Sequence, residues 1–341
     1  MPENQNHNLN DLRKSAISQP LVTDKFTADP SAHLFNGKIY IYPSHDIDAG
    51  IPFNDNGDHF GMRDYHVYSM DSPDDRKAKD LGKILDIDDV PWAKRQMWAP
   101  DIAENAGKYF FYFPAKDHND IFRIGVAIAD SPTGPFTAEK KYIEGSYSID
   151  PAIFNDNGNY YMYFGGIWGG QLQKYRENIY REGNELPDDN EPALGPIVAK
   201  MSDDMKSFSS VPKEIKILDE KGNYLTAGDN ERRYFEGPWM HTYNDKYYLS
   251  YSTGDTHFIC YAIGDNPTGP FKYGGRILEP VIGWTTHHSI LEIDGRWFLF
   301  YHDSSLSEGV THLRCMKVVE IFYDEHGKII TVSPYSRSIQ K

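Results

Sequence analysis

Three acidic residues occupy equivalent places in this chain and could do chemistry together. They are Asp29 in ADPSAHLF, Asp150 in SIDPAIF and Glu236 in YFEGPWM. Carboxyl groups that share a pocket can divide into a protonated acid and an ionised base, because burial and neighbouring charges shift their pKa values apart. A single Asp-Pro pair is a common turn initiator. Three acids at the same place in a repeat instead indicate an active site.

The elements that must position these acids follow a recurring pattern. A polar turn followed by a dense aromatic strand appears in residues 36–46, 106–117, 157–166, 244–255 and 294–305. A Gly or Asp turn before alternating aromatic and aliphatic residues predicts a β-hairpin. A second short apolar stretch before each turn supplies the first strand of the hairpin. The turn positions are 70, 51, 87 and 50 residues apart, at Gly37, Gly107, Gly158, Asp245 and Gly295.

Five imperfect repeats predict an all-β fold, a five-bladed β-propeller, in preference to a β-sandwich or a solenoid. Plain blades take roughly 40–50 residues, so the two long intervals predict insertions at residues 46–64 and 167–195. The first strand of each propeller blade lines the central channel, and Asp29, Asp150 and Glu236 should therefore converge on one axis. The proline after each aspartate predicts extended backbone at Asp29 and Asp150.

The composition argues against some classes of partner and against cysteine-based sites. The net charge of −15 over 341 residues repels phosphate backbones and argues against nucleic acid as a partner. Aromatic residues make up 14% of the chain, which favours strands. Two cysteines, Cys260 and Cys315, are too few for a disulfide framework or a cysteine metal site, and we expect both to be reduced core residues.

The sequence indicates one domain preceded by a short lead-in segment. Residues 1–20 are polar and end in Pro20, so we expect an extended lead-in, followed by a single propeller domain over residues 21–341. No run approaches the roughly 20 apolar residues that span a membrane. The N-terminus lacks the apolar segment of a signal peptide. These features predict a cytoplasmic protein without a membrane partner, although a processed periplasmic or secreted form would look the same.

The motifs ADPSAHLF, WAPDIAE, SIDPAIF, YFEGPWM and HHSI, in this order, strongly resemble glycoside hydrolase family 43. The resemblance runs from about residue 20 to the C-terminus. It implies a five-bladed propeller enzyme that acts on xylosides or arabinofuranosides. It also implies that Asp29 is the general base that activates water, that Glu236 is the general acid, and that Asp150 orients Glu236 and adjusts its pKa. Inversion needs the acid and the base roughly 6.5–9.5 Å apart, on opposite faces of the sugar.

The same resemblance suggests three further site residues. Trp98 in WAPD matches an aromatic wall of the sugar pocket, with a core tryptophan as the alternative. Arg314 in HLRCMKV matches an arginine that contacts substrate hydroxyls, and its charge would offset the repulsion among three acids. His287 in TTHHSI matches a ligand of a calcium ion whose shell is completed by waters. The alternative for His287 is a buried histidine bonded to backbone.

Weaker candidates follow the aromatic strands. His45 and Asp46 in PSHD, Trp168 in GGIWGG and His257 in GDTHF could reach the rim of the pocket. Asp101 is better explained as a residue that holds a blade turn. The acidic run 55–58 lacks the spacing of an EF-hand and is interpreted as a loop.

The favoured function is an inverting exo-glycosidase that releases pentose from short plant-polysaccharide oligosaccharides. β-Xylosidase comes first and a dual α-L-arabinofuranosidase activity second, because both sugars need the same acid and base. An endo-arabinanase and a non-catalytic carbohydrate-binding propeller are the alternatives. The expected partner is a xylo- or arabino-oligosaccharide. We expect calcium as a possible cofactor and no organic cofactor. A homo-oligomer is also compatible with the sequence.

Overall fold

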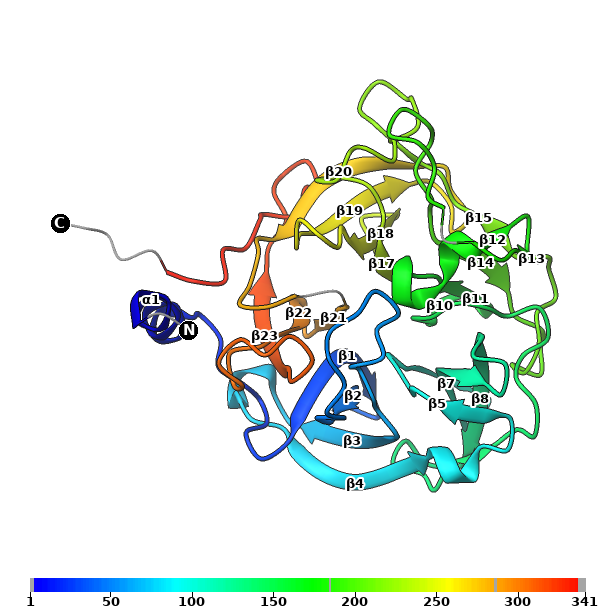
Figure 1. Ribbon diagram of the computed structural model, residues 1–341, viewed down its shortest axis with the longest axis horizontal. Coiled ribbons are helices and arrows are strands. Elements are labelled where there is room, and N and C mark those ends of the chain that lie inside the picture. Colours follow the sequence, from blue (N-terminus) through cyan, green and yellow to red (C-terminus); the bar gives the residue numbers. More distant parts are fainter. Residues whose placement is uncertain (1–2, 184, 285–286, 337–341) are drawn as a thin grey trace.

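Five sheets surround a central axis in the computed structural model, which describes residues 3–183, 185–284 and 287–336 (Figure 1). The five-bladed propeller predicted from the repeats is confirmed. The first hairpin of each sheet places its inner strand next to the axis, and the later strands lie farther out (Figure 1). Each sheet is called a blade and numbered in chain order.

Blades I to III comprise the first half of the chain. Blade I contains β1 (Phe26–Phe35), β2 (Lys38–Asp46), β3 (Asp64–Met70) and β4 (Lys79–Asp86). Blade II contains β5 (Ala93–Arg95), β6 (Asp101–Asn105), β7 (Lys108–Asp117), β8 (Phe122–Ala129) and β9 (Thr137–Ala138). Blade III contains β10 (Ala152–Asp156), β11 (Asn159–Phe164), β14 (Ile197–Lys200) and β15 (Lys213–Glu214).

Blades IV and V complete the ring. Blade IV contains β16 (Ile217–Leu218), β17 (Glu236–Tyr243), β18 (Lys246–Ser252), β19 (Ile259–Gly264) and β20 (Phe271–Leu278). Blade V contains β21 (Ser289–Ile293), β22 (Arg296–Asp303) and β23 (Cys315–Ile321). The remaining elements are α1 (Glu3–Ser15), η1 (Pro73–Asp75), η2 (Ile87–Asp89), η3 (Trp168–Gly170), η4 (Leu172–Lys174), β12 (Tyr175–Arg176) and β13 (Ile179–Tyr180).

The five predicted hairpin turns are present at the same end of the blades. In each, two residues separate the paired strand ends, and both have positive φ, as type I′ turns require. The pairs are Asn36–Gly37, Ala106–Gly107, Asn157–Gly158, Asn244–Asp245 and Asp294–Gly295. Because this turn twists in the same sense as the strands, it fixes which residues of the inner strand face the axis.

The start and the end of the chain close the ring. The Leu21 N–H donates to the Met316 carbonyl at 2.9 Å, and the Thr27 N–H donates to the Arg314 carbonyl at 2.9 Å. Residues 21–27 therefore lie along β23, and blade V is joined to blade I by main-chain hydrogen bonds. This closure brings Arg314, near the C-terminus, beside β1.

Buried side chains tie neighbouring blades together. Asp101 accepts hydrogen bonds from the Ser31 hydroxyl (2.5 Å) and the Ile153 N–H (2.5 Å), and it contacts His33 Nε2 at 2.7 Å. It thus links blades I, II and III, in agreement with the structural role expected for it. Cys260 and Cys315 are free and buried, as expected.

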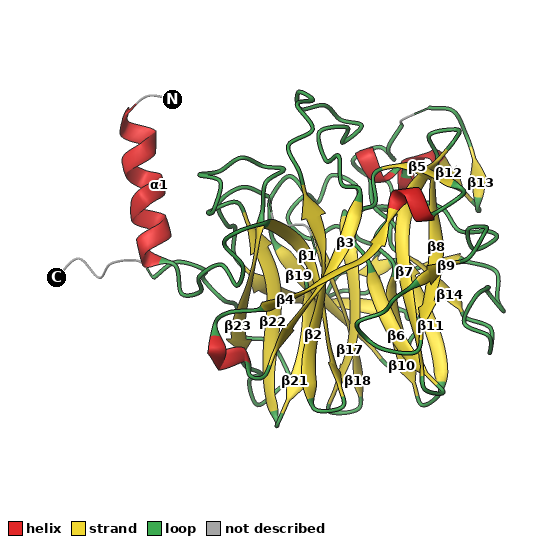
Figure 2. Cartoon of the chain, turned by 90° about the horizontal axis from the view of Figure 1, so that it is seen from below, coloured by secondary structure: helices red, strands yellow, loops and turns green. Residues whose placement is uncertain are grey.

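The lead-in is not extended as the sequence analysis predicted. Glu3–Ser15 form helix α1, which projects beside the propeller (Figure 2). No Gly or Pro lies between Pro2 and Pro20, and Arg13 and Lys14 fall in the last turn, where cations favour a helix end. The segment therefore lacks helix-breaking residues, and its polar composition did not exclude a helix. No helix within the described part of the chain has the length and apolarity needed to cross a membrane.

Both predicted insertions are present. Residues 46–64 connect β2 to β3, and residues 167–195 contain η3, η4, β12 and β13 between β11 and β14. The hairpin β12–β13 lies at the end of the propeller opposite the short hairpin turns (Figure 2). The insertions therefore add material to one end of the channel, where a site can be enclosed.

Candidate active site

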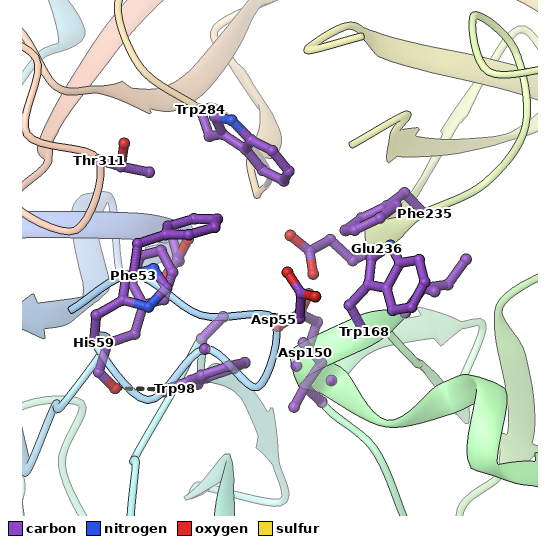
Figure 3. A pocket seen from close by; sticks show the side chains of 18 of the residues that line it. Phe53, Asp55, His59, Trp98, Asp150, Trp168, Phe235, Glu236, Trp284 and Thr311 are labelled. Atoms are coloured by element: carbon purple, nitrogen blue, oxygen red, sulfur yellow. Dashed lines mark hydrogen bonds between the residues drawn. The ribbon is translucent and has the colours of Figure 1, made fainter. Parts of the chain in front are cut away.

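A pocket of about 200 Å³ opens where the two insertions meet the inner strands. Asp29, Asp150 and Glu236 all line it, so the predicted convergence of the three acids is observed. Aromatic rings form much of the remaining wall, from Phe53, Phe60, Trp98, Trp168, Phe235 and Trp284. The Glu236 side chain points into the space between these rings (Figure 3). A half-open pocket with largely aromatic walls and several carboxylates suits a small polyhydroxylated ligand.

Local backbone distortion aims Asp29 and Asp150 into the pocket. The β1–β2 register shifts between Ala28 and Ser31, which is a bulge that re-aims the intervening side chain. Asp29 has φ 50° and Asp150 has φ 58°. The prediction of extended backbone before proline was therefore wrong for φ. Positive φ is unfavourable for a residue with a Cβ, and such strain is concentrated at functional sites.

Asp29 is a carboxylate held by a cation and a hydroxyl. The Ser44 hydroxyl donates to Asp29 Oδ2 at 2.6 Å, and Arg314 Nη1 donates to Oδ1 at 3.0 Å. The side chain of Asp29 is only 5% exposed. Charge-assisted bonds of this kind are short and fix the orientation of the carboxylate. The arrangement suits a base that takes a proton from water.

Arg314 is itself fixed by Asp46. Its Nε and Nη2 donate to the two Asp46 carboxylate oxygens, both at 2.8 Å. Burial alone would lower the pKa of Arg314, but the carboxylates of Asp29 and Asp46 outweigh burial and raise it. The guanidinium is therefore a permanent positive charge beside Asp29, and it lines the pocket as predicted.

His302 fixes the backbone of Asp29. The Asp29 N–H donates to His302 Nδ1 at 2.9 Å, which requires that nitrogen to be unprotonated. Burial, with a smaller contribution from Arg314, lowers the pKa of His302 well below its ordinary value. The ring is therefore neutral and acts as an acceptor for the strained residue.

Asp150 is almost completely buried. It accepts a hydrogen bond from the Gly237 N–H at 3.0 Å. Burial raises the pKa of Asp150, although His287 and the Gly237 N–H act in the opposite direction. The contact with Gly237 joins Asp150 to the residue that follows Glu236. Asp150 can therefore orient the peptide that carries Glu236.

Glu236 begins β17 at a second bulge. The β17–β18 register shifts between Glu236 and Trp239, and Gly237 between them has φ 66°. A Cβ at Gly166 would lie 3.0 Å from the Glu236 Cβ, so the glycine leaves space for the acid. Glu236 is partly exposed to the pocket, unlike the two aspartates. Access from the pocket is what a proton donor to a bound sugar needs.

The insertion over residues 46–64 is attached to blade II. Arg95 Nη1 donates to Asp58 at 2.6 Å, Gln96 Nε2 donates to the Gly57 carbonyl at 2.8 Å, and Trp98 Nε1 donates to the Phe60 carbonyl at 2.9 Å. The dashed line at Trp98 in Figure 3 marks its hydrogen bond with the Phe60 carbonyl. These bonds hold the loop in place against blade II. Trp98, and Trp168 from the other insertion, both line the pocket as predicted.

Two predicted contacts lie outside the pocket. His257 stacks edge-on against Trp284 at 4.9 Å between ring centroids, so it supports a ring that lines the pocket. His45 does not line the pocket; its Nδ1 lies 2.6 Å from Asp64 Oδ1 on blade I. Neighbouring residues of a strand face opposite sides. Asp46 turns toward Arg314, and His45 therefore turns away.

Several residues that line the pocket or hold Asp29 in place were not predicted from the sequence. Phe53, Phe60, Phe235, Trp284 and Thr311 line the pocket, and Ser44 and His302 hold Asp29. Phe235 directly precedes Glu236, and Trp284 directly precedes the TTHHSI motif. Their positions next to these motifs could have predicted that they line the pocket. Phe53 and Phe60 lie within the predicted insertion. Nothing in the local pattern marks His302.

The surroundings of His287 fit the calcium site that the resemblance implies. The side chain is 1% exposed and its Nδ1 lies 3.8 Å from Asp150 Oδ2, beyond hydrogen-bond distance. Neither ring nitrogen has a hydrogen-bond partner among the described residues. Burial alone would lower the pKa of His287, but Asp150 outweighs burial and raises it. A buried imidazole beside a carboxylate can bind a cation once its own proton is lost, so the ion would compete with protonation of His287.

Comparisons with known proteins agree with this geometry. The model of Glycosyl hydrolases family 43 matches residues 18–328. A xylosidase/arabinosidase of Bacteroides ovatus is 58% identical over 92% of this chain and 96% of its own length. A family 43 β-xylosidase/α-arabinofuranosidase from a compost metagenome, solved in complex with xylotriose in a calcium-free form, superposes with a TM-score of 0.92 at 62% identity, covering 95% of this chain and 99% of that chain.

A second solved structure is the GH43_1 enzyme of Xanthomonas citri complexed with xylotriose. It has a TM-score of 0.93 and 53% identity, and the match covers 97% of this chain and 98% of that chain. The match extends over the whole propeller, with all three acids in one pocket. The chain therefore belongs to glycoside hydrolase family 43 and is a glycoside hydrolase.

Proposed function

We propose that this enzyme is an inverting exo-glycosidase that removes a terminal xylose from short xylo-oligosaccharides, with α-L-arabinofuranosidase activity as a second capacity. The observation that carries the proposal is the convergence of Asp29, Asp150 and Glu236 in one small pocket. Its volume of about 200 Å³ is below the roughly 300–1,000 Å³ of pockets that enclose drug-sized ligands. A terminal sugar fits such a space better than the middle of a long polymer does.

The roles of the three acids follow from their surroundings. Asp29, ionised beside Arg314 and Ser44, removes a proton from the attacking water. Glu236, which is open to the pocket, protonates the leaving oxygen as the glycosidic bond breaks. Asp150, bonded to the Gly237 N–H, keeps Glu236 in position. Water attacks one face of the sugar while the leaving group departs from the other, and the anomeric configuration inverts.

The relatives support the choice of pentose. The Bacteroides ovatus relative is named for both xylosidase and arabinosidase activity, and both solved relatives were crystallised with xylotriose. The insertions over residues 46–64 and 167–195 build one end of the pocket and favour exo action over the open cleft of an endo-arabinanase.

The direct test is hydrolysis of xylotriose followed by proton NMR of the first products. We expect xylose and xylobiose as early products, and the newly released xylose as the α-anomer, because inversion converts a β-linkage. Nitrophenyl β-D-xylopyranoside and α-L-arabinofuranoside compared in parallel give the pentose preference. An initial β-anomer would contradict inversion, and internal cleavage of longer xylo-oligosaccharides would contradict exo action.

We also propose that a calcium ion is held near the axis through His287, with waters completing its shell. Oxygen ligands dominate calcium sites, so one imidazole among waters makes a weak and exchangeable site. Bound there, the ion would supply a positive charge close to Asp150 and the pocket floor.

Chelation tests this second proposal. We expect turnover to fall several-fold after EDTA treatment and gel filtration, and to recover when calcium is added back. The His287→Ala variant should have low turnover that neither step changes. If the wild-type enzyme keeps full turnover through both steps, the ion has no functional role at His287.

A further inference from the structure

A group of histidines and carboxylates lies on blade I, outside the pocket. His45 is the last residue but one of β2, and Asp64 and His66 lie two residues apart on β3. Successive residues of a strand alternate between faces, so Asp64 and His66 share one face. The register pairs Ser44 with Tyr65, which places His45 opposite Asp64 and diagonally across from His66. One imidazole or carboxylate atom from each of His45, Asp64 and His66 lies within 4.8 Å of the others.

A second carboxylate and a lysine border this group. His66 Nδ1 lies 3.1 Å from both carboxylate oxygens of Asp80, and Lys25 Nζ donates to Asp80 Oδ2 at 2.8 Å. The contact with Asp80 orients the His66 ring, as carboxylates commonly do for histidines that bind metals. Asp80 and Lys25 largely balance each other, so Asp64 supplies the net charge at the two imidazoles.

The three side chains are only partly buried. The side chains of His45, Asp64 and His66 are 20%, 21% and 14% exposed. An ion can reach them from solvent, and they retain some freedom to move.

We propose that His45, Asp64 and His66 form a binding site for a divalent transition-metal ion, with Zn²⁺ as its representative. Imidazole nitrogen and carboxylate oxygen are the donors that zinc accepts, and three protein ligands plus water are a common zinc set. Zinc bonds of about 2.0–2.1 Å place neighbouring tetrahedral donors about 3.3 Å apart. From their 4.8 Å limit the three donor atoms must draw together by at most about 1.5 Å, which the partial exposure of the side chains permits.

This site is chemically distinct from the calcium position at His287. Calcium prefers six to eight oxygen ligands, whereas two imidazoles favour zinc, nickel or copper. His45 also precedes Asp46, which holds Arg314 against Asp29. An ion on blade I would stabilise the strand end that carries this support without entering the pocket. The competing interpretation is two separate His–Asp hydrogen bonds that bind no ion.

The test is calorimetric titration of metal-free full-length enzyme with ZnCl₂ at pH 7.5, together with thermal unfolding. We expect one zinc equivalent to bind wild type and to raise its Tm. His66→Ala and Asp64→Asn should each weaken this binding at least tenfold and lose the Tm increase. His326→Ala, at an exposed histidine, is the matched control and should bind zinc like wild type.

Two further measurements make the outcome decisive. Circular dichroism and turnover of nitrophenyl xyloside show whether each variant is folded, and His66→Gln replaces His66→Ala if the latter unfolds. Co²⁺ bound to wild type should show the visible absorption of a tetrahedral site, and this should persist in His287→Ala. The proposal is overturned if zinc binds wild type and both blade I variants equally, if binding is lost only in His287→Ala, or if wild type binds no zinc.

Discussion

Replacing Glu236 by glutamine is expected to lower kcat/KM for xylobiose by about 10³-fold. General acid catalysis contributes typically 10²–10⁴-fold, and glutamine keeps the shape of the side chain without a transferable proton. The leaving xylose oxygen would then depart as an alkoxide, which is a poor leaving group. The bulge at β17 and the space left by Gly166 do not depend on the carboxyl group, so the fold should be unchanged.

The leaving group separates this role from a structural one. Nitrophenolate departs without protonation, so the loss for nitrophenyl xyloside should be at least tenfold smaller than the loss for xylobiose. Steady-state kinetics with both substrates measure this difference. Glu325→Gln, at a residue whose side chain is 87% exposed, is the control and should leave both values unchanged. Equal losses for the two substrates would contradict the assignment of Glu236 as the acid.

Replacing Asp29 by asparagine should lower kcat by about 10³-fold with both substrates. The base acts on water, and water must be activated whichever group leaves. Asparagine is nearly isosteric, and its one carbonyl oxygen can still accept from Arg314, while its amide group can donate to the Ser44 hydroxyl, so binding of the sugar should change little. We therefore expect the loss mainly in kcat, with KM within a few-fold of wild type.

Steady-state kinetics on xylobiose and nitrophenyl xyloside test this second expectation, with Asp130→Asn as the control. The side chain of Asp130 is 86% exposed and pairs only with Lys108 among the described residues. If Asp29→Asn loses much more activity on xylobiose than on the nitrophenyl substrate, Asp29 behaves as a proton donor and the two roles must be exchanged. Retained turnover on both substrates would remove Asp29 from the reaction altogether.

The hairpins could be predicted from sequence because their signals are local. A two-residue turn such as Asn36–Gly37 or Asp294–Gly295 encodes positive φ directly, and alternation along the following strand marks its faces. Repetition of this unit five times leaves few architectures besides a propeller. The position of each acid within its repeat then predicts convergence, since equivalent positions on inner strands face the same axis.

The pocket wall could not be predicted in the same way. Phe53 and Phe60 lie in an irregular insertion, and their placement depends on bonds to Arg95, Gln96 and Trp98 in another blade. Loops carry no periodicity from which a direction can be read. The prediction that His45 reaches the pocket rim failed for a related reason. His45 and Asp46 are adjacent residues of β2, so their side chains lie on opposite faces of the sheet.

The sequence by itself determined the repeating hairpin, the number of blades and the three acids, because turn chemistry, alternation and residue type are properties of short segments. Only the tertiary structure decided which groups surround the two aspartates. Asp29 is paired with Arg314 across 285 residues, its N–H is bound by His302 across 273 residues, and Asp150 is bonded to Gly237 across 87. These contacts exist because ring closure and blade packing bring distant segments together. They give Asp29 and Asp150 different surroundings, although the two Asp-Pro pairs look alike in the sequence.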